Sequence, residues 1–573
     1  MLTKIRNILN EFNADFMLIF TADFHLSEYI NEYFKLKEIL SGFCGSAGTL
    51  LISKNEAFLF TDGRYFLQAE NELKQDFKLI KSPDYISYIK DNFNNKTALL
   101  DLRTISYTNY LKLSEVAKIV DFTINYNDFH SRTLPNDKVF YQNPKFVDNI
   151  NKIKRLQNEL SEKNIDYCVI SSLSDIAYLT NLRGKDVEYN PVFLSYLIVS
   201  KTKAYFYIDE NKLSEIIKDE DLIYKDYFDF YDDLKTLKGN IICDFSNTNA
   251  KIISQIKANI INEILPSTMQ KACKSANEIK HLKYAHLLDG IALCKFNHWL
   301  ENTDLSSVDE CKIDEVLTNY RADNEYFISN SFDTIAGFNE NGAIIHYKAK
   351  KNNAKFLNEN GLLLLDSGAQ YECGTTDITR VFKINKASKE QIRDYTLVLK
   401  SNIAISKILY PENIKMPLLD SIARKELWQY GLDYLHGTGH GVGYFLNVHE
   451  GPQVLSLNAN ASEHTRVKRG MLTSIEPGLY HANKYGIRLE NLAISEFAMS
   501  SEYGDFLRFD IVTLYPFELS LIDLNMLNTD EIKWLNDYHL RVFNTLNPYL
   551  DDYLKNFLAY KCREIPILNS TNF

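Results

Sequence analysis

The first half of the chain contains two stretches with the same order of sequence features. Each stretch combines an amphipathic segment, a short apolar run and a pair of apolar segments, the pattern of a helix, a buried strand and a hairpin. The matching pairs are residues 13–16 and 164–167, 17–20 and 168–170, 50–54 and 197–201, and 57–60 and 204–207. Two such copies predict tandem α/β domains, although two unrelated α/β segments can also share this pattern.

Changes of pattern divide the chain into further segments. A turn-rich break lies at residues 134–137, and a second lies at residues 266–268. A long helical pattern begins at Ala276. We therefore predict one domain over residues 1–136, a second over residues 137–275 and a third that begins at residue 276.

Composition and charge exclude several classes of protein. The chain has 573 residues, and its 64 Lys and Arg against 75 Asp and Glu give a formal net charge of −11. A dedicated nucleic-acid-binding protein would need a basic stripe instead. No apolar run approaches the roughly 18–20 residues that cross a bilayer. The eight cysteines are scattered, without CxxC spacing, as in proteins with reduced thiols.

The N-terminal segment has the pattern of an amphipathic helix and lacks the apolar core of a secretory signal. The apolar residues on one face of this predicted helix are Leu2, Ile5, Ile8, Leu9 and Phe12. Together with the composition, this segment predicts a cytoplasmic protein that binds neither nucleic acid nor membranes.

Two aspartates in the last third of the chain flank a predicted hairpin. Residues 362–365 are four leucines, typical of a buried strand, and Asp366 follows them directly. Asp377 lies eleven residues later, beyond a predicted polar turn at residues 373–376, so a hairpin would bring the two carboxylates face to face. Either aspartate can be an ordinary turn residue or cap. A carboxylate after four leucines nevertheless needs a partner or a metal, because buried charge is costly.

A glycine-rich segment carries the next candidate residues. It runs His436-Gly-Thr-Gly-His440-Gly-Val-Gly443, and His449 follows it in Asn-Val-His-Glu. Four glycines in eight residues exclude a stable helix, since each costs about 1 kcal/mol relative to alanine. His436 and His440 are therefore not a helical pair, and the glycines let imidazoles crowd around a small centre. One histidine is more often a core residue than a ligand, but three within fourteen positions favour a site.

Two glutamates complete the set. Glu476 precedes Pro-Gly, and Glu490 lies in an alternating segment, residues 487–492, that predicts one strand with Arg488 and Glu490 on the same face. An Arg–Glu pair on a solvated face is the alternative. With the aspartates and His440, the glutamates give four carboxylates and one imidazole, which suit a pair of Mn²⁺, Co²⁺ or Zn²⁺ ions. Without cations, such carboxylates would raise one another's pKa.

The order of these motifs resembles that of the pita-bread metallopeptidases, which include methionine aminopeptidases, prolidases and Xaa-Pro aminopeptidases. Longer phrases are similar to the large three-domain aminopeptidase P family, at residues 41–48, 61–68, 342–347, 436–452 and 522–539. The resemblance implies an α/β (α+β) fold with two tandem creatinase-like N-terminal domains. It also implies a pita-bread catalytic domain over residues 276–510, a C-terminal extension over residues 511–573, and a homodimer.

The resemblance also implies a role for each candidate residue. The ligands of two divalent ions would be Asp366, Asp377, His440, Glu476 and Glu490, with Mn²⁺ expected first and Zn²⁺ or Co²⁺ also compatible. The residues around the substrate would be His346 and His449 at the scissile peptide, His436 and Arg488 beside them, Tyr480 at the proline ring, and Arg64 from the N-terminal domain. Tyr480 can equally be a core residue, and the Thr-Asp-Gly-Arg64 motif can equally be a structural turn.

The implied reaction is the release of the first residue from a peptide with proline in the second position. The metal pair would produce hydroxide from a bridging water, Glu476 would pass a proton to the prolyl nitrogen, and His449 would stabilise the oxyanion. The alternatives are a prolidase that cuts only Xaa-Pro dipeptides, a non-catalytic binding or chaperone protein, and a metal-free hydrolase of the creatinase type. The two N-terminal domains disfavour the first alternative, and the full ligand set disfavours the other two.

Overall fold

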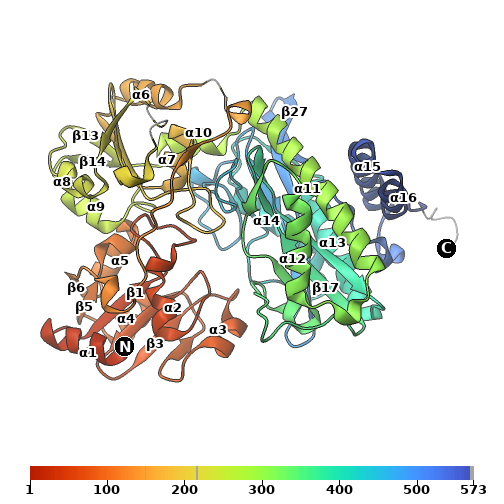
Figure 1. Ribbon diagram of the computed structural model, residues 1–573, viewed down its shortest axis with the longest axis horizontal. Coiled ribbons are helices and arrows are strands. Elements are labelled where there is room, and N and C mark those ends of the chain that lie inside the picture. The colour runs from red at the N-terminus through yellow and green to blue at the C-terminus, as the bar shows by residue number, and fades with distance from the viewer. Residues whose placement is uncertain (149, 215–216, 218, 568–573) are drawn as a thin grey trace. The chain divides into compact units, whose positions relative to one another are not determined.

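The computed structural model describes residues 1–148, 150–214, 217 and 219–567. The chain forms two compact units, Met1–Lys271 and Ala272–Phe573, which run from red to yellow and from green to blue in Figure 1. Among the described residues, every helix is too short or too polar to span a lipid bilayer.

Two six-stranded sheets with the same topology build the first unit. The first sheet has the order β4 (Lys78–Ile80), β3 (Ala57–Phe60), β2 (Thr49–Ser53), β1 (Phe16–Phe20), β5 (Thr97–Leu100) and β6 (Lys118–Asp121). The second has the order β12 (Leu222–Lys225), β11 (Ala204–Tyr207), β10 (Tyr196–Ser200), β8 (Tyr167–Ile170), β13 (Asn240–Cys243) and β14 (Asn259–Asn262). In both, the central strand pairs antiparallel with a hairpin on one side and parallel on the other. The predicted duplication is confirmed.

Helices cover these sheets and the connections between them. They are α1 (Leu2–Glu11), α2 (Leu36–Ser41), α3 (Phe66–Glu72), α4 (Tyr85–Asn92), α5 (Tyr107–Ser114), α6 (Lys152–Glu162), α7 (Leu173–Thr180), α8 (Phe230–Leu234), α9 (Ala250–Gln255) and α10 (Pro266–Ala272), with a short strand pair β7 (Phe140–Tyr141) and β9 (Leu182–Arg183). Helix α1 buries Ile5 and Leu9, as its periodicity predicts. Phe12 lies beyond the end of this helix, is 43% exposed and packs edge-on against Phe122.

The second unit begins with a long helix and contains several small sheets. Its helices are α11 (Ala276–Asn302), α12 (Glu310–Ala322), α13 (Lys389–Ser406), α14 (Asp420–Trp428), α15 (Thr529–Leu546) and α16 (Asp552–Lys561). One sheet has the order β16 (Ile335–Phe338), β17 (Gly361–Ser367), β20 (Ile378–Ile384), and another the order β21 (Leu409–Pro411), β28 (Gly504–Ile511), β27 (Asn491–Ser501), β24 (Leu472–Ile475). The remaining strands are β15 (Phe327–Asn330) with β18 (Ala369–Tyr371) and β19 (Gly374–Thr375), β22 (Gly439–His440) with β23 (Val454–Leu455), and β25 (Gly478–His481) with β26 (Tyr485–Arg488).

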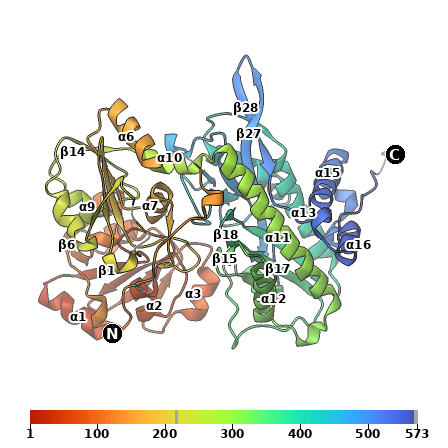
Figure 2. The same ribbon diagram turned by 45° about the horizontal axis from the view of Figure 1, so that its top comes forward.

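Local signals fix the start of this unit and its central strand. A capping box between Ser275 and Glu278 starts α11 where the helical pattern begins. The four leucines of β17 are fully buried, because the strand has neighbours on both sides and its side chains lie in the main hydrophobic core of the unit. Figure 2 shows α11 and α13 beside the strands, with α15 and α16 packed against these two helices.

One local prediction in this unit is confirmed in part, and another is wrong. The turn predicted around residue 373 lies at residues 372–373, and residues 374–375 form β19, which pairs with β18 in a second small hairpin. Residues 487–492 are not one strand, because β26 ends at Arg488 and β27 begins at Asn491. Between these strands, the backbone N–H of Glu490 donates to the carbonyl of Thr379 on β20 instead of continuing the pairing with β25.

Candidate metal centre

The hairpin of β17 and β20 carries the two candidate aspartates. The strands pair antiparallel, with Asp366 opposite Thr379 and Ser367 opposite Ile378. Asp377 lies directly before β20, and the charge of Asp366 acts on its carboxyl group. The predicted hairpin is therefore present, with both carboxylates at the same end.

His440 faces the carboxylates from the glycine-rich segment. One ligand atom each of Asp377, His440 and Glu490 lies within 4.8 Å of the others. The Nε2 atom of His440 is 3.7 Å from Asp377 Oδ2 and 3.3 Å from Glu476 Oε1. Its Nδ1 atom lies 2.9 Å from the carbonyl of Gly441, so Nδ1 carries the proton and Nε2 presents its lone pair to the carboxylates.

Three carboxylate oxygens at this centre have no hydrogen-bond partner among the described residues. They are Asp366 Oδ1, Asp377 Oδ1 and Glu490 Oε1, and all are buried. Other oxygens of the same groups are satisfied, since Asp366 Oδ2 accepts from Arg488 at 2.5 Å and Glu490 Oε2 accepts from Thr379 at 2.8 Å. A buried carboxylate oxygen without a partner is costly. The unsatisfied oxygens and the imidazole nitrogen therefore fit divalent cations of the Mn²⁺, Zn²⁺ or Co²⁺ type.

The charges of these groups conflict when no cation is present. Burial raises the pKa of Asp377 well above its usual value, and the charges of Glu490 and Asp366 raise it further. Burial also raises the pKa of Glu490, together with the charge of Glu476. For Glu476, burial raises the pKa to about 7 although the Arg488 guanidinium opposes this change. A bound cation would reverse the shifts by stabilising the charged forms.

A polar chain leads from Asp366 to the histidine-rich loop. Arg488 donates from Nη2 to Asp366 and from Nη1 to the Tyr480 hydroxyl at 2.7 Å. The Nδ1 atom of His436 faces the carbonyl of Gly437, so the hydroxyl donates to Nε2 of His436 at 2.8 Å. Tyr480 and His436 are thereby held next to the candidate ligands, and Tyr480 also packs against the hydrophobic core.

The remaining candidate residues lie in different parts of the chain. The ring of His449 is 4.3 Å from that of His440, measured between centroids. His346 directly follows Ile345, whose carbonyl lies 3.5 Å from Arg488 Nη2. Arg64 belongs to the first unit, where its guanidinium forms a two-point ion pair with Asp62 at 2.9 and 2.8 Å.

Three supporting residues were missed by the sequence predictions. Thr379 lies two positions after Asp377 and binds Glu490, and Ser474 lies two positions before Glu476 and accepts from the N–H of His440 while it donates to Glu476. The two-residue period of a strand would have identified both. The side-chain amide of Asn402, on α13, donates to the carbonyls of residues 475 and 489, each directly before a candidate glutamate. A buried asparagine on a helix gave no local signal for this role.

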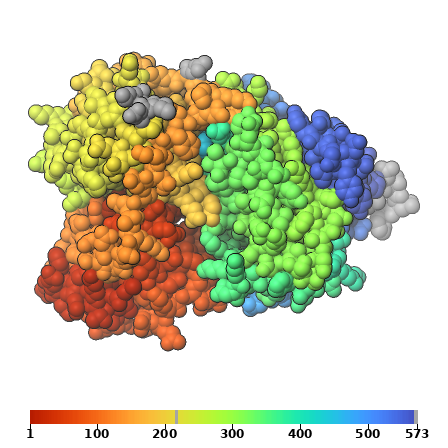
Figure 3. Space-filling view, viewed as in Figure 1, coloured from red at the N-terminus to blue at the C-terminus, as the bar shows by residue number. Residues whose placement is uncertain are grey.

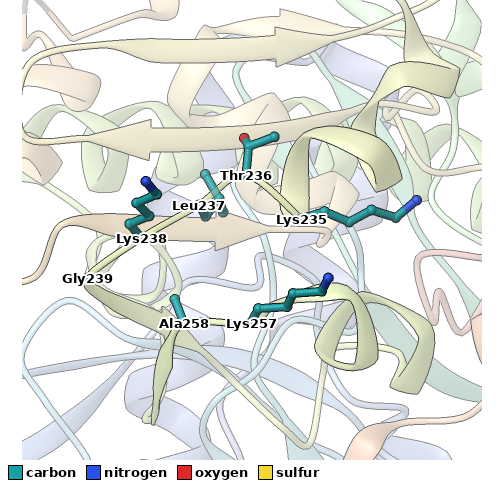
Figure 4. A pocket seen from close by; sticks show the side chains of 7 residues that line it. All are labelled: Lys235, Thr236, Leu237, Lys238, Gly239, Lys257 and Ala258. Carbon is teal, nitrogen blue, oxygen red and sulfur yellow. The ribbon is translucent and has the colours of Figure 1, made fainter.

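A pocket in the first unit has a different chemistry. It measures about 630 Å³ and lies near the end of α8. Its lining contains Lys235, Lys238 and Lys257 but no carboxylate or imidazole (Figure 4). The pocket therefore offers no carboxylate or imidazole ligand for a divalent cation.

Four regions of the chain match described protein families. Residues 1–126 and 131–278 each match a creatinase/prolidase N-terminal domain, residues 280–495 match metallopeptidase family M24, and residues 505–565 match the C-terminal region of peptidase M24. The predicted ends at residues 136, 275 and 510 remain predictions, since a matched range is not a domain boundary.

Individual relatives match the chain over nearly its full length. "Xaa-Pro aminopeptidase 1" of Dictyostelium discoideum is 35% identical over 584 residues, which cover 96% of this chain and 93% of the relative. "Probable Xaa-Pro aminopeptidase P" of Coprinopsis cinerea is 34% identical, covering 96% and 95%. The structure of an X-prolyl aminopeptidase from Caenorhabditis elegans, described as a cytosolic enzyme with a di-nuclear active site, has a TM-score of 0.92 at 30% identity and covers 98% and 99%.

A prolidase structure from Pyrococcus horikoshii shares the fold over a smaller part of the chain. It has a TM-score of 0.53 at 22% identity and covers 65% of this chain and all of the prolidase. The matches confirm the predicted architecture of two creatinase-like N-terminal domains and a pita-bread domain. The chain therefore belongs to metallopeptidase family M24, in its branch of large Xaa-Pro aminopeptidases with creatinase-type N-terminal domains.

Proposed function

We propose that the chain is a metal-dependent aminopeptidase that releases the N-terminal residue from peptides with proline in the second position. One observation carries this proposal: buried, unsatisfied carboxylate oxygens converge with the Nε2 atom of His440 in a chain that matches Xaa-Pro aminopeptidases over 96% of its length. The buried carboxylates would not be expected of a binding or chaperone module, because such a module has no need for uncompensated buried charge.

Five residues would hold two divalent cations: Asp366, Asp377, His440, Glu476 and Glu490. Mn²⁺ is our first choice, and Zn²⁺ or Co²⁺ suits the same donors. The di-nuclear site of the Caenorhabditis elegans relative supports a pair of ions. When bound, such ions polarise the scissile carbonyl and lower the pKa of a water molecule.

Glu476 is the proposed proton carrier. Its side chain is 16% exposed, compared with 11% for Asp366 and 5% for Asp377, so it is the best placed of these carboxylates to meet substrate. Ser474 donates to Glu476 Oε1 and fixes the orientation of the carboxylate. Glu476 would accept a proton from the attacking water and transfer it to the prolyl nitrogen of the leaving peptide.

Histidines around the centre would bind the scissile peptide. His449, whose ring lies against that of His440, would donate a hydrogen bond to the developing oxyanion, and His346 would contact the same peptide. His436 and Arg488 would hold Tyr480 against the proline ring through their hydrogen bonds to its hydroxyl. Arg64 would contribute a further substrate contact from the N-terminal domain.

The choice between an aminopeptidase and a prolidase has a direct test. Metal-stripped protein, with and without added Mn²⁺, is incubated with an Xaa-Pro-Pro tripeptide, the matched Xaa-Ala-Pro tripeptide and an Xaa-Pro dipeptide. We expect Mn²⁺-dependent release of the first residue from the Xaa-Pro-Pro peptide only. Cleavage of the dipeptide alone would establish a prolidase, and no cleavage with Mn²⁺, Zn²⁺ or Co²⁺ would leave the non-catalytic alternative. The prolidase structure covers only 65% of this chain, which supports the longer-peptide enzyme.

We also propose a cytoplasmic homodimer. The eight cysteines are scattered without CxxC spacing, as expected in a reducing compartment, and the Caenorhabditis elegans relative is described as cytosolic. Light scattering during gel filtration is expected to give about twice the chain mass of 66.4 kDa. A mass equal to that of one chain at micromolar concentration would exclude the dimer, and cell fractionation would test the compartment.

A further inference from the structure

Arg380 connects the C-terminal region to the residues around the metal centre. It lies on β20, three positions after Asp377, and only 3% of it is exposed. Within the described residues its guanidinium forms no ion pair, and all of its hydrogen bonds go to carbonyl, amide or hydroxyl oxygens. A buried cation without a carboxylate partner depends on every one of these oxygens.

One side of the guanidinium holds the backbone of Glu490. The Nη1 atom of Arg380 donates to the carbonyl of Glu490 at 2.5 Å and to that of Thr379 at 3.0 Å, while Nη2 donates to Asn491 Oδ1 at 2.8 Å. The N–H of Glu490 in turn donates to the Thr379 carbonyl at 3.1 Å. Both peptide groups of Glu490 are therefore fixed, and they set the direction of its side chain toward Asp377 and His440.

The other side of the guanidinium is held by the C-terminal region. Arg380 donates to the carbonyls of Tyr515 at 2.6 Å and Pro516 at 3.2 Å, and its guanidinium carbon lies 4.2 Å from the centre of the Phe517 ring. On α15, the Tyr538 hydroxyl lies 3.0 Å from Arg380 Nη2 and donates to the Tyr515 carbonyl at 2.8 Å. Residues 515–517 thus contact both Arg380 and α15.

Helix α15 also fixes residues 515–517 from behind. Burial, with the nearby Arg380 charge, lowers the pKa of His539 to about 3, so its imidazole is neutral and accepts a hydrogen bond from the N–H of Phe517 at 3.1 Å. In Figure 3 the C-terminal residues, in blue, form a continuous surface with the green helices of the second unit. The C-terminal region is therefore built into this unit and is not a separate appendage.

We propose that the C-terminal region is part of the metal centre: through Arg380, residues 515–517 and Tyr538 hold Glu490 where its carboxylate binds a cation. Arg380, Phe517 and Tyr538 are positioning residues, since in the described structure none of them makes a hydrogen bond to a side-chain carboxylate oxygen of a candidate ligand. This proposal rests on the assignment of Glu490 as a metal ligand under the proposed function.

The test compares metal affinity in three variants of the full-length protein. Arg380→Lys keeps the charge but loses the forked guanidinium, and Tyr538→Phe removes only one hydroxyl. The matched control is Tyr395→Phe, because the Tyr395 hydroxyl is also buried and accepts from the N–H of Glu518 in the C-terminal region at 2.9 Å, while among the described residues it makes no hydrogen bond with Arg380 or Glu490. Mn²⁺ affinity is measured by chelator competition, and thermal unfolding is recorded in EDTA.

We expect Arg380→Lys to weaken Mn²⁺ binding about 10- to 100-fold, the usual effect of losing an outer partner of a ligand. Tyr538→Phe should weaken it several-fold, whereas Tyr395→Phe should lower the unfolding temperature with unchanged Mn²⁺ affinity. At saturating Mn²⁺, Arg380→Lys and Tyr538→Phe should have KM values close to that of the wild type, whereas their kcat values should stay lower. A general loss of stability would not produce this difference.

Two results would overturn the proposal, and a third would overturn the ligand assignment on which it rests. If Arg380→Lys folds and binds Mn²⁺ like the wild type, Arg380 does not position Glu490. If Arg380→Lys does not fold, Tyr538→Phe decides, and an affinity equal to that of Tyr395→Phe contradicts the role of the C-terminal region. Wild-type protein that binds no Mn²⁺, Zn²⁺ or Co²⁺ would instead overturn the ligand assignment itself, which separates that failure from the first two.

Discussion

Asp377→Asn is expected to lower kcat/KM for an Xaa-Pro-Pro tripeptide by a factor of ~10³ or more while the protein stays folded. The substitution replaces a carboxylate that faces His440 Nε2 at 3.7 Å and has one unsatisfied buried oxygen. An amide is a weaker ligand than a carboxylate for a hard cation. Loss of about 4 kcal/mol, within the several kcal/mol that a metal ion supplies to a transition state, corresponds to this factor. Steady-state kinetics at saturating Mn²⁺ measure it.

The stability of the metal-free protein gives the control for folding. The pKa of Asp377 is raised in the native state, so between about pH 4 and the raised value the native state binds more protons than the unfolded state. Stability in EDTA should therefore fall as pH rises through this window. Asp377→Asn removes one of the conflicting charges, so its decline should be shallower and its unfolding temperature at pH 7.5 higher than that of the wild type.

Added Mn²⁺ should reverse this order, because the cation binds the wild-type carboxylates more tightly and stabilises the native state by mass action. Asp552→Asn is the matched control, since the Asp552 side chain is 98% exposed and lies away from the centre. That variant should follow the wild type in activity and in both unfolding curves. Near-normal turnover in Asp377→Asn would remove Asp377 from the ligand set.

The parts of the fold that were predictable from the sequence are those with local or periodic signals. The two copies in the first unit were recognisable because each buried strand is a short apolar run in the same order, and the two sheets have the same strand pairing. Helix α11 begins at Ala276, where Ser275 and Glu278 form a capping box within four residues. The hairpin of β17 and β20 was predictable because a carboxylate directly after four buried leucines requires a partner.

The parts that were not predictable depend on contacts between distant segments. Alternation alone could not separate β26 from β27, because the break at Glu490 is made by a hydrogen bond to Thr379, on a strand far away in the sequence. Asn402 supports two candidate glutamates from α13, and no spacing relates it to either. The contacts of Arg380 with Tyr515 and Pro516 likewise exist only once the C-terminal region has folded back.

His449→Ala is expected to lower kcat about 10²- to 10³-fold with Mn²⁺ affinity close to that of the wild type. Removal of one hydrogen-bond donor to a developing oxyanion costs roughly 3–4 kcal/mol. The ring of His449 packs edge-on against that of His440 at 4.3 Å, which places it beside the proposed metal centre.

The donor role makes this prediction distinct from a loss of packing. His449→Gln keeps an N–H donor of similar reach, so part of the lost kcat should return in that variant but not in His449→Ala. His464→Ala, at an exposed histidine of the same unit, should leave kcat and KM unchanged. A fall in Mn²⁺ affinity as large as that of Asp377→Asn would make His449 a ligand, and unchanged kcat would exclude it from the reaction. Because Asp377 and His449 both lie beside His440, separate effects on binding and on kcat would divide this centre into a metal-holding and a substrate-binding part.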